Sequence, residues 1–267
     1  MPHPYFADAA RPSILAHRGF VTADLAAQGV VENSRAAMAA ALDAGADYLE
    51  TDCRMTSDGV VVLVHDADLL RLLGDERKVA EISHRELAAL MADRGGLLTL
   101  AQAFDEFPRA RFNVDVKAAE APEAAGRIIA PHAERALINS FSDARRLRAL
   151  AAAVAARPGG PRPATSPGRG TITRVLGSMA WFSRASTAGT LADLDALQIP
   201  ERQGPVRVLS RRLLTAAHRA GVEVHVWTIN DPQRMEELAR LGVDGIVTDR
   251  TDLALSVLGR FRREGRG

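Results

Sequence analysis

The sequence predicts an α/β protein built as one (β/α)₈ TIM barrel, with a small excursion after the second strand. Its 267 residues come close to the roughly 250 residues of such a barrel. Short apolar or β-branched runs alternate with helical patterns along most of the chain, as in parallel βαβ units. Eight such units of about 33 residues account for the whole length. We therefore expect a single domain over residues 1–267.

The eight expected strands are short apolar or β-branched runs. We place them at residues 14–16, 48–52, 111–116, 136–139, 171–176, 194–199, 222–227 and 245–247.

Three of the expected helices are bounded by clear start and stop signals, at 34–45, 210–221 and 231–242. Each range opens on Ser or Asp, whose side chain can cap the free N–H groups of a first turn. Each ends on Gly, which readily adopts the left-handed conformation that closes a helix. These signals indicate helices that cover the outside of the strands.

Two segments interrupt the alternation. Residues 53–97 contain a strand-like run at 60–64, directly after the turn signal Asp58-Gly59, and we interpret it as the excursion and not as a ninth barrel strand. Residues 157–170 are rich in Pro, Gly and Arg, which predicts a flexible loop without regular structure. Because that loop is expected to run from a helix into a strand, we place it on the face opposite the catalytic one.

The composition restricts the class of partner. Lys and Arg number 34 against 33 Asp and Glu, a net charge of +1, so the overall balance predicts no nucleic-acid partner and places any phosphate recognition locally. The single cysteine, Cys53, excludes an internal disulfide. No apolar run approaches the ~20 residues of a membrane span, and the first residues lack the apolar core of a signal peptide. We expect a cytoplasmic protein, of an oligomeric state that the sequence leaves open.

Polar residues gather where the expected strands end. These ends are His17-Arg18-Gly19, Glu50-Thr51-Asp52, His65-Asp66 and the run 113–117. In a (β/α)₈ barrel the carboxyl ends of the strands converge on one active site. Side chains alternate along a strand, so Glu50 and Asp52 point the same way, as do Asp115 and Lys117. Three carboxylates are therefore predicted to meet in the barrel mouth.

Three carboxylates so close together repel one another unless a cation neutralises them. Hard oxygen ligands suit Mg²⁺ or Ca²⁺ better than zinc or copper, and the chain has no Cys/His ligand cluster. The alternative is that the three are unrelated strand-end carboxylates that form caps and salt bridges.

An ordered set of segments resembles the glycerophosphodiester phosphodiesterase family, in its bacterial, single-domain, cytoplasmic type. The segments are AHRGF (16–20), ENS (32–34), ALDAGADYLETD (41–52), TSDGVVVLVHD (56–66), NVDVK (113–117) and VHVWTINDPQRMEELARLGVDGIVTD (224–249). They occur in the family's order and span nearly the whole chain.

The resemblance implies hydrolysis of a small-molecule glycerophosphodiester to glycerol 3-phosphate and an alcohol, with one divalent cation, Mg²⁺ or Ca²⁺. By resemblance, the metal ligands are Glu50, Asp52 and Asp115, the acid/base pair is His17 and His65, the phosphate-binding cations are Arg18 and Lys117, and Trp227 lines the substrate pocket. The chain departs from the family pattern at Val31, where proline is common, and at Asp115, where many members have glutamate. The Asp115 side chain is one methylene shorter than glutamate, and this difference affects the affinity for the metal and the choice between Mg²⁺ and Ca²⁺.

The chemistry of the histidines agrees with this assignment. An ordinary imidazole pKa of about 6.5 lets two histidines exchange protons near neutral pH on opposite sides of a phosphorus atom. One would deprotonate the attacking oxygen, either water or the substrate's own hydroxyl, and the other would protonate the departing alcohol. The sequence does not decide which histidine does which.

Other polar and aromatic residues admit two interpretations. Glu32 is a further metal-shell residue or a hydrogen-bonding residue of its loop, and His225 is expected to be a hydrogen-bonded interior histidine. For Asp249 a turn or helix cap is the preferred interpretation. Trp181-Phe182 is either an apolar lip on the catalytic face, after the expected fifth strand, or ordinary core packing.

Two alternative functions accompany the leading one. A lysophospholipase D would use the same site on a substrate that carries an acyl chain, and a catalytically silent barrel would serve only for binding. The three carboxylates and two histidines argue against a silent barrel. An amidohydrolase is disfavoured because the metal-binding histidine pairs that suit that chemistry are absent from the sequence.

Overall fold

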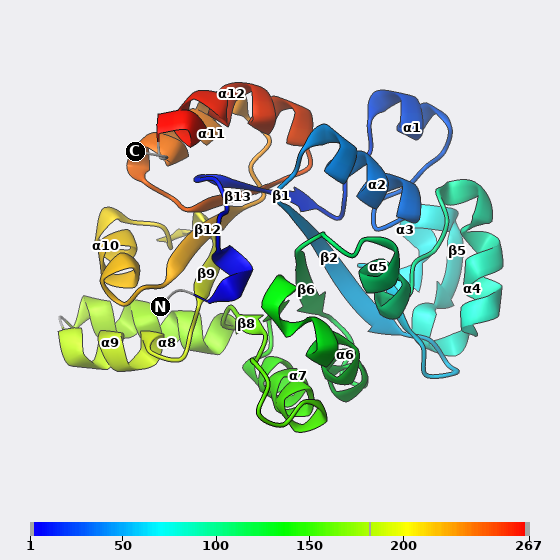
Figure 1. Cartoon of the computed structure of the whole chain (residues 1–267), viewed down its shortest axis with the longest axis horizontal. Helices are drawn as coiled ribbons and strands as arrows, with labels where there is room; N and C mark the ends of the chain where they lie inside the picture. Colours follow the sequence, from blue (N-terminus) through cyan, green and yellow to red (C-terminus); the bar gives the residue numbers. More distant parts are fainter. Residues whose placement is uncertain (1–2, 182, 265–267) are drawn as a thin grey trace.

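A computed structural model describes residues 3–181 and 183–264. Eight parallel strands stand side by side in the order β8-β7-β6-β2-β1-β13-β12-β9, surrounded by helices (Figure 1). The strands are β1 (Ser13–His17), β2 (Tyr48–Met55), β6 (Phe112–Val116), β7 (Ala136–Asn139), β8 (Ala164–Thr165), β9 (Ala196–Pro200), β12 (Glu223–Trp227) and β13 (Gly245–Thr248). The predicted barrel is confirmed.

The barrel is nearly closed. The two end strands of this order, β8 and β9, share no strand ladder. They are joined by hydrogen bonds from the Asp195 backbone N–H to the Thr165 carbonyl (3.1 Å) and from the Gln198 backbone N–H to Ser166 Oγ (3.0 Å). These bonds stand where a ladder would close the barrel.

Helices follow most strands and form the outer layer. The α-helices are α1 (Ala23–Ala27), α2 (Arg35–Ala44), α3 (Leu70–Leu73), α4 (His84–Leu90), α5 (Leu100–Glu106), α6 (Pro122–Ile129), α7 (Asp143–Ala156), α8 (Arg169–Ala180), α9 (Arg184–Leu191), α10 (Arg211–Arg219), α11 (Pro232–Leu241) and α12 (Thr251–Glu264). Short 3₁₀ segments are η1 (Pro4–Phe6), η2 (Val79–Glu81), η3 (Ala92–Arg94) and η4 (Ala130–Arg135).

The three helices predicted from their caps are confirmed as α2, α10 and α11. Ser34, Ser210 and Asp231 each accept a hydrogen bond from a first-turn backbone N–H. The glycines that end α2 and α11 lie in the left-handed region.

The excursion is also confirmed. β3 (Val61–Leu63) pairs antiparallel with the end of β2 and stays outside the barrel order, and β4 (Asp68–Leu69) pairs with β5 (Asp75–Lys78) in a separate two-stranded sheet. These pieces pack with α4 around a small apolar cluster of their own, which includes Val62, Val64 and Leu87. The excursion thereby holds the segment after β3 against the end of β2.

The predicted fifth strand, residues 171–176, is wrong. That segment lies inside α8, where Thr171, Val175 and Met179 are buried at a spacing of four. The strand is β8, two residues long, inside the segment 157–170 that was expected to lack regular structure. Residues 166–168, in the second half of the 157–170 segment, therefore follow a strand. The prediction that this part lies on the face opposite the carboxyl ends of the strands is also wrong. The physical reason is that β-branched residues are tolerated in a helix whose buried face they fill.

Apolar side chains close the amino-terminal end of the barrel. Tyr5 and Phe6, from η1, are buried against Leu15, Tyr48 and neighbouring strand residues. The opposite end, where the strands finish, is left for polar side chains. Among the described residues, no helix combines the length and apolar character required to cross a bilayer.

Candidate active site

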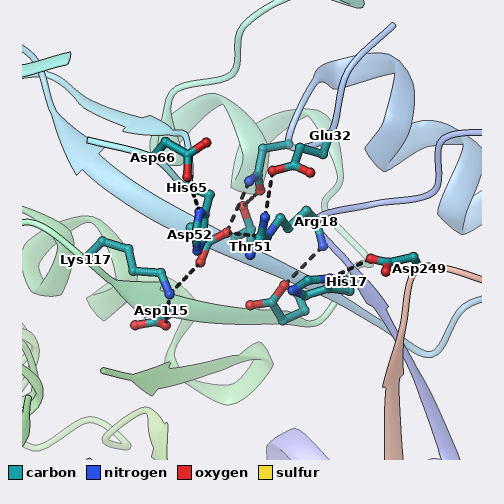
Figure 2. A network of polar contacts seen from close by, with 12 residues as sticks. His17, Arg18, Glu32, Thr51, Asp52, His65, Asp66, Asp115, Lys117 and Asp249 are labelled. Atoms are coloured by element: carbon teal, nitrogen blue, oxygen red, sulfur yellow. Dashed lines mark hydrogen bonds and ion pairs between the residues drawn. The ribbon is translucent and has the colours of Figure 1, made fainter. Parts of the chain in front are cut away.

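The strand ends bring together the residues that the sequence singles out (Figure 2). β1 ends at His17 and is followed by Arg18, β2 carries Glu50 and Asp52, His65 follows β3, and β6 carries Asp115 and is followed by Lys117. The register pairs His17 with Glu50 and Asp52 with Asp115 across neighbouring strands. In this register the side chains of the three carboxylates gather in the barrel mouth, as their spacing predicts.

The three carboxylates are buried together and carry more negative charge than their surroundings readily stabilise. Glu50 is 7% exposed, Asp52 1% and Asp115 3%. Burial, reinforced by the charge of Asp52, raises the pKa of Glu50 to about 8. Burial likewise raises the pKa of Asp115. This part of the site therefore favours an added positive charge.

Two side-chain cations already lie in the cluster. Lys117 Nζ lies 2.6 Å from Asp115 Oδ2 and 3.1 Å from Asp52 Oδ1, and Arg18 Nε lies 3.1 Å from Asp52 Oδ2. Burial alone would raise the pKa of Asp52, but the charges of Lys117 and Arg18 outweigh it and hold that pKa below its ordinary value. Asp52 is thus the carboxylate that the cations neutralise best.

The donor set suits a hard divalent cation. Asp115 Oδ1 is buried and accepts no hydrogen bond, although a buried carboxylate oxygen normally has a partner. The side chains do not form a complete coordination shell. Over the described ranges, no group of three or more His, Cys, Asp or Glu residues is arranged to hold a metal ion. Lys117 lies between Asp52 and Asp115 instead. The oxygen chemistry, the orphaned oxygen and the raised pKa of Glu50 all fit a cation in this place.

An aspartate that follows the neighbouring strand β13 orients His17. His17 Nδ1 lies 2.6 Å from Asp249 Oδ1, and Asp249 follows β13. Asn230 Nδ2 donates to the other carboxylate oxygen of Asp249 (2.7 Å), and Asn230 Oδ1 accepts from the Asp249 backbone N–H (2.9 Å). Burial lowers the pKa of His17, but the Asp249 hydrogen bond and the charge of Glu50 outweigh it, so the pKa is raised. The arrangement leaves Nε2 of His17 as the nitrogen that can exchange protons.

His65 is oriented in the same way by its own neighbour. His65 Nδ1 lies 2.6 Å from Asp66 Oδ1, and Arg71 Nε donates to Asp66 Oδ2 (2.6 Å). Arg71 also pairs with Glu32 (2.6 Å), which in turn pairs with Arg18 (2.8 Å). Glu32 therefore joins the excursion to the phosphate-binding candidate Arg18. In Figure 2, Arg18 and Asp52 lie between the two histidines.

The backbone at the end of β1 is held in an unusual conformation. Arg18 has φ 59°, a left-handed value that is uncommon for a residue with a side chain. Its N–H donates to the Glu50 carbonyl (2.9 Å) and to Glu50 Oε2 (3.1 Å). Gly19, at φ 84°, follows because a Cβ there would lie 2.7 Å from the backbone of Ala37. This turn directs the guanidinium of Arg18 back into the cluster.

An apolar groove of about 770 Å³ adjoins the polar cluster. Trp227, at the end of β12, lines it together with Phe141, and the two rings meet edge to face at 5.8 Å. Lys117 Nζ lies 4.7 Å from the centre of the Phe141 ring, so the ammonium connects the cluster to the groove. The groove continues between α8 and the hairpin of β10 (Arg202–Gln203) and β11 (Val206–Arg207).

The structure settles three residues that admitted two interpretations. His225 is fully buried and contacts Glu223 and Gln198, which confirms an interior histidine. Trp181 is 86% exposed at the end of α8, so core packing is wrong for it; Phe182 lies outside the described residues. Asp249 lies in a bend after β13, but its side chain contacts His17 and Asn230, so the helix-cap interpretation is wrong.

Sequence reasoning missed the residues that hold the histidines. The sequence places Asp66 at a strand end and favours a turn or helix cap for Asp249, and it assigns neither to a histidine. The signal was available, because both follow a strand whose polar end points into the barrel mouth. Asn230 had no signal in the sequence, since its role depends on a contact with Asp249 across a loop.

Comparisons with known proteins identify the family of the chain. Residues 17–253 match the Glycerophosphoryl diester phosphodiesterase family. A probable glycerophosphodiester phosphodiesterase 2 from Mycobacterium tuberculosis is 36% identical over 248 residues, 91% of this chain and 89% of the relative.

Solved structures show the same fold. A glycerophosphodiester phosphodiesterase from Thermotoga maritima superposes with a TM-score of 0.67 at 24% identity, over 91% of this chain and 97% of its own. A phosphodiesterase from Oleispira antarctica, solved with the product sn-glycerol-3-phosphate, gives 0.66 at 21% identity, over 93% and 97%. With its strand-end carboxylates, histidines and cations in one barrel mouth, the chain belongs to the glycerophosphoryl diester phosphodiesterase family.

Proposed function

We propose that the protein hydrolyses glycerophosphodiesters to glycerol 3-phosphate and an alcohol, with His17 and His65 as the acid and base. The observation that carries this proposal is the pair of histidines, each held at Nδ1 by an aspartate 2.6 Å away beside a cluster of carboxylates and two cations. Family membership supports the reaction, and so does the Oleispira antarctica relative, whose bound product is sn-glycerol-3-phosphate.

The side chains supply each part of a phosphodiester hydrolysis. Arg18 and Lys117 bind the phosphate oxygens and stabilise the charge that grows on them. With Nδ1 committed to an aspartate, Nε2 of one histidine takes the proton of the attacking oxygen, water or a substrate hydroxyl. Nε2 of the other gives a proton to the departing alcohol oxygen, so that neither oxygen carries a full charge.

Glu50, Asp52 and Asp115 would hold one divalent cation, Mg²⁺ or Ca²⁺. When bound, such an ion supplies additional stabilisation of negative charge on the phosphate. Its charge would also offset the burial and the nearby Asp52 charge that together raise the pKa of Glu50 to about 8. Lys117 is then free to move from the carboxylates to the substrate phosphate.

The test is replacement of each histidine. His17→Ala and His65→Ala should each lower the rate of glycerol 3-phosphate release from glycerophosphocholine by about 10²- to 10⁴-fold. Both variants should keep the circular dichroism spectrum and melting temperature of the parent. His84→Ala is the matched control, because His84 lies at the start of α4, away from the cluster. Near-normal turnover in either site variant would exclude the two-histidine mechanism.

The apolar groove favours a second candidate, lysophospholipase D activity. Its lining next to Trp227 includes Ile172, Leu176, Met179 and Val208, which offer no polar group to a headgroup but suit an acyl chain. A Leu176→Asp change should impair hydrolysis of lysophosphatidylcholine more than hydrolysis of glycerophosphocholine. Equal losses on both substrates would remove this candidate.

A further inference from the structure

The net charge of +1 conceals a local excess of positive charge. Residues 169–219, from α8 to the end of α10, hold eight arginines against the three acidic residues Asp193, Asp195 and Glu201. All eight arginine side chains are exposed. They are Arg169, Arg174, Arg184, Arg202, Arg207, Arg211, Arg212 and Arg219. We call the surface of residues 169–219 the basic face.

Most of these arginines lack an acidic partner. Within residues 3–181 and 183–264, five of the eight form no ion pair: Arg184, Arg202, Arg207, Arg211 and Arg219. In that same part of the chain, the hydrogen bond of the Arg202 side chain goes to a carbonyl of its own hairpin. Elsewhere in the described part of the chain some exposed arginines are paired, as in Arg35 with Glu106 and Arg148 with Glu123, and single ones such as Arg85 and Arg127 are not, but they are not gathered in one stretch of the chain. The charge of the basic face is therefore available to an external anion.

Apolar side chains protrude from the same face. Trp181 is 86% exposed, more than any other large apolar side chain among the described residues, and Val206 is 54% exposed. Trp181 directly follows Met179-Ala180 in the chain. Met179 lines both the groove beside Trp227 and a second groove between α9 and α10, whose lining carries Arg184, Arg211 and Arg219. Trp181 lines neither groove and stands exposed at the end of α8, two residues after Met179.

The basic face is continuous with the candidate active site. The groove that contains Met179 and Arg207 also contains Trp227 and Asn139, at the ends of β12 and β7. Whatever binds this face therefore lies beside the opening through which a substrate reaches the two histidines.

We propose that the basic face docks on an anionic lipid surface. Unpaired arginines are attracted to anionic headgroups at about 1 kcal/mol each close to the surface, which is a factor of about five in affinity. A protruding tryptophan is the side chain that lodges best at a membrane–water interface. The catalytic groove then opens onto the bilayer. This proposal concerns surface binding and does not depend on the hydrolytic reaction.

A bilayer fits the observations better than a nucleic acid or an acidic protein does. The positive charge is spread around a helical hairpin, a β-hairpin and a third helix, and it does not follow one narrow groove. The exposed Trp181 and Val206 sit among the arginines, and burying them requires an apolar layer beneath the anionic one.

The test is flotation with vesicles of phosphatidylcholine, either pure or containing 30 mol% phosphatidylglycerol. The protein should float with the anionic vesicles and not with the neutral ones, and added salt should release it. The triple variant Arg184→Glu, Arg202→Glu, Arg211→Glu, which leaves the lining of the groove beside Trp227 unchanged, should bind the anionic vesicles at least a hundredfold more weakly. The control variant Arg85→Glu, Arg109→Glu, Arg127→Glu reverses three exposed arginines on other elements and should bind as the parent does.

Tryptophan fluorescence separates a bilayer from other polyanions. Trp181 and Trp227 are the two tryptophans of the chain, and the emission should shift to shorter wavelength on anionic vesicles in the parent but much less in Trp181→Phe. Heparin should produce no such shift. Equal binding to neutral vesicles, equal losses in both triple variants, or vesicle binding without a fluorescence shift would each overturn the proposal. All variants should retain turnover of soluble glycerophosphocholine, so failure of docking is distinguishable from failure of catalysis.

Discussion

Asp249 gives the sharpest mutational test of how the site works, because its side chain acts on the substrate only through His17. In Asp249→Asn the negative charge beside His17 Nδ1 is removed and the shape is kept. A hydrogen bond to a charged group contributes about 1.5–3 kcal/mol. The Asp249 side chain is 51% exposed, so water weakens the contact and we take the lower part of that range, about 1.5–2 kcal/mol. The expected fall in kcat is about 10- to 30-fold.

The assay is release of glycerol 3-phosphate from glycerophosphocholine, measured as kcat and KM across pH. KM should change little, because Asp249 is not among the phosphate-binding candidates. The Asp249 hydrogen bond raises the pKa of His17. Its loss should therefore shift the limb of the pH–rate profile that reports His17 to lower pH.

Two controls make this prediction refutable. Asp252→Asn removes a similarly exposed aspartate, 43% against 51%, whose ion pair is with Arg250, and it should leave kcat and the pH profile unchanged. In a His17→Ala background, Asp249→Asn should cause no further loss, because the two residues act as one unit. A parent-like kcat in Asp249→Asn, or a further loss on top of His17→Ala, would refute the positioning role.

Two other variants test the supports of the site. Asp143 accepts hydrogen bonds from the Gly168 N–H, the Thr171 N–H and the Thr171 hydroxyl, so Asp143→Ala should lower the free energy of urea unfolding by about 2–3 kcal/mol at pH 7. Burial raises the pKa of Asp143, but these hydrogen bonds outweigh it and lower the pKa. The difference in unfolding free energy between variant and parent should therefore persist above about pH 4 and shrink as the pH falls further. A difference that grew in acid would contradict this sign. Arg71 is half-exposed, and its contacts to Asp66 and Glu32 are each worth about 0–1 kcal/mol, so Arg71→Ala should lower kcat less than about 30-fold. A loss as large as that of His65→Ala would show that Arg71 itself contacts the substrate.

Much of the site could be predicted from the sequence because strand ends obey a simple rule. Residues two apart on a strand share a face, and the carboxyl ends of barrel strands meet at one end. Glu50, Asp52 and Asp115 could therefore be placed together without any knowledge of distances. Likewise a serine followed eleven residues later by a glycine marked helices such as α2.

The errors came where local pattern and tertiary contact disagree. β8 has two residues, too few to show any periodicity, whereas the β-branched run from Thr171 looks like a strand and is a helix. Asp249 resembles a helix cap in sequence, and its contact with His17 spans 232 positions of the chain. The exposure of Trp181 at the end of α8 is a property of the folded chain that no local sequence pattern defines.

The central claim is metal-dependent hydrolysis of a glycerophosphodiester at the three carboxylates. Its most direct test is to strip the purified protein of metal and to measure glycerol 3-phosphate release from a panel of glycerophosphodiesters with Mg²⁺, with Ca²⁺ and with neither. We expect no release without metal and recovery with at least one of the two ions, through Glu50, Asp52 and Asp115. Release at the same rate in the metal-free protein would contradict the account.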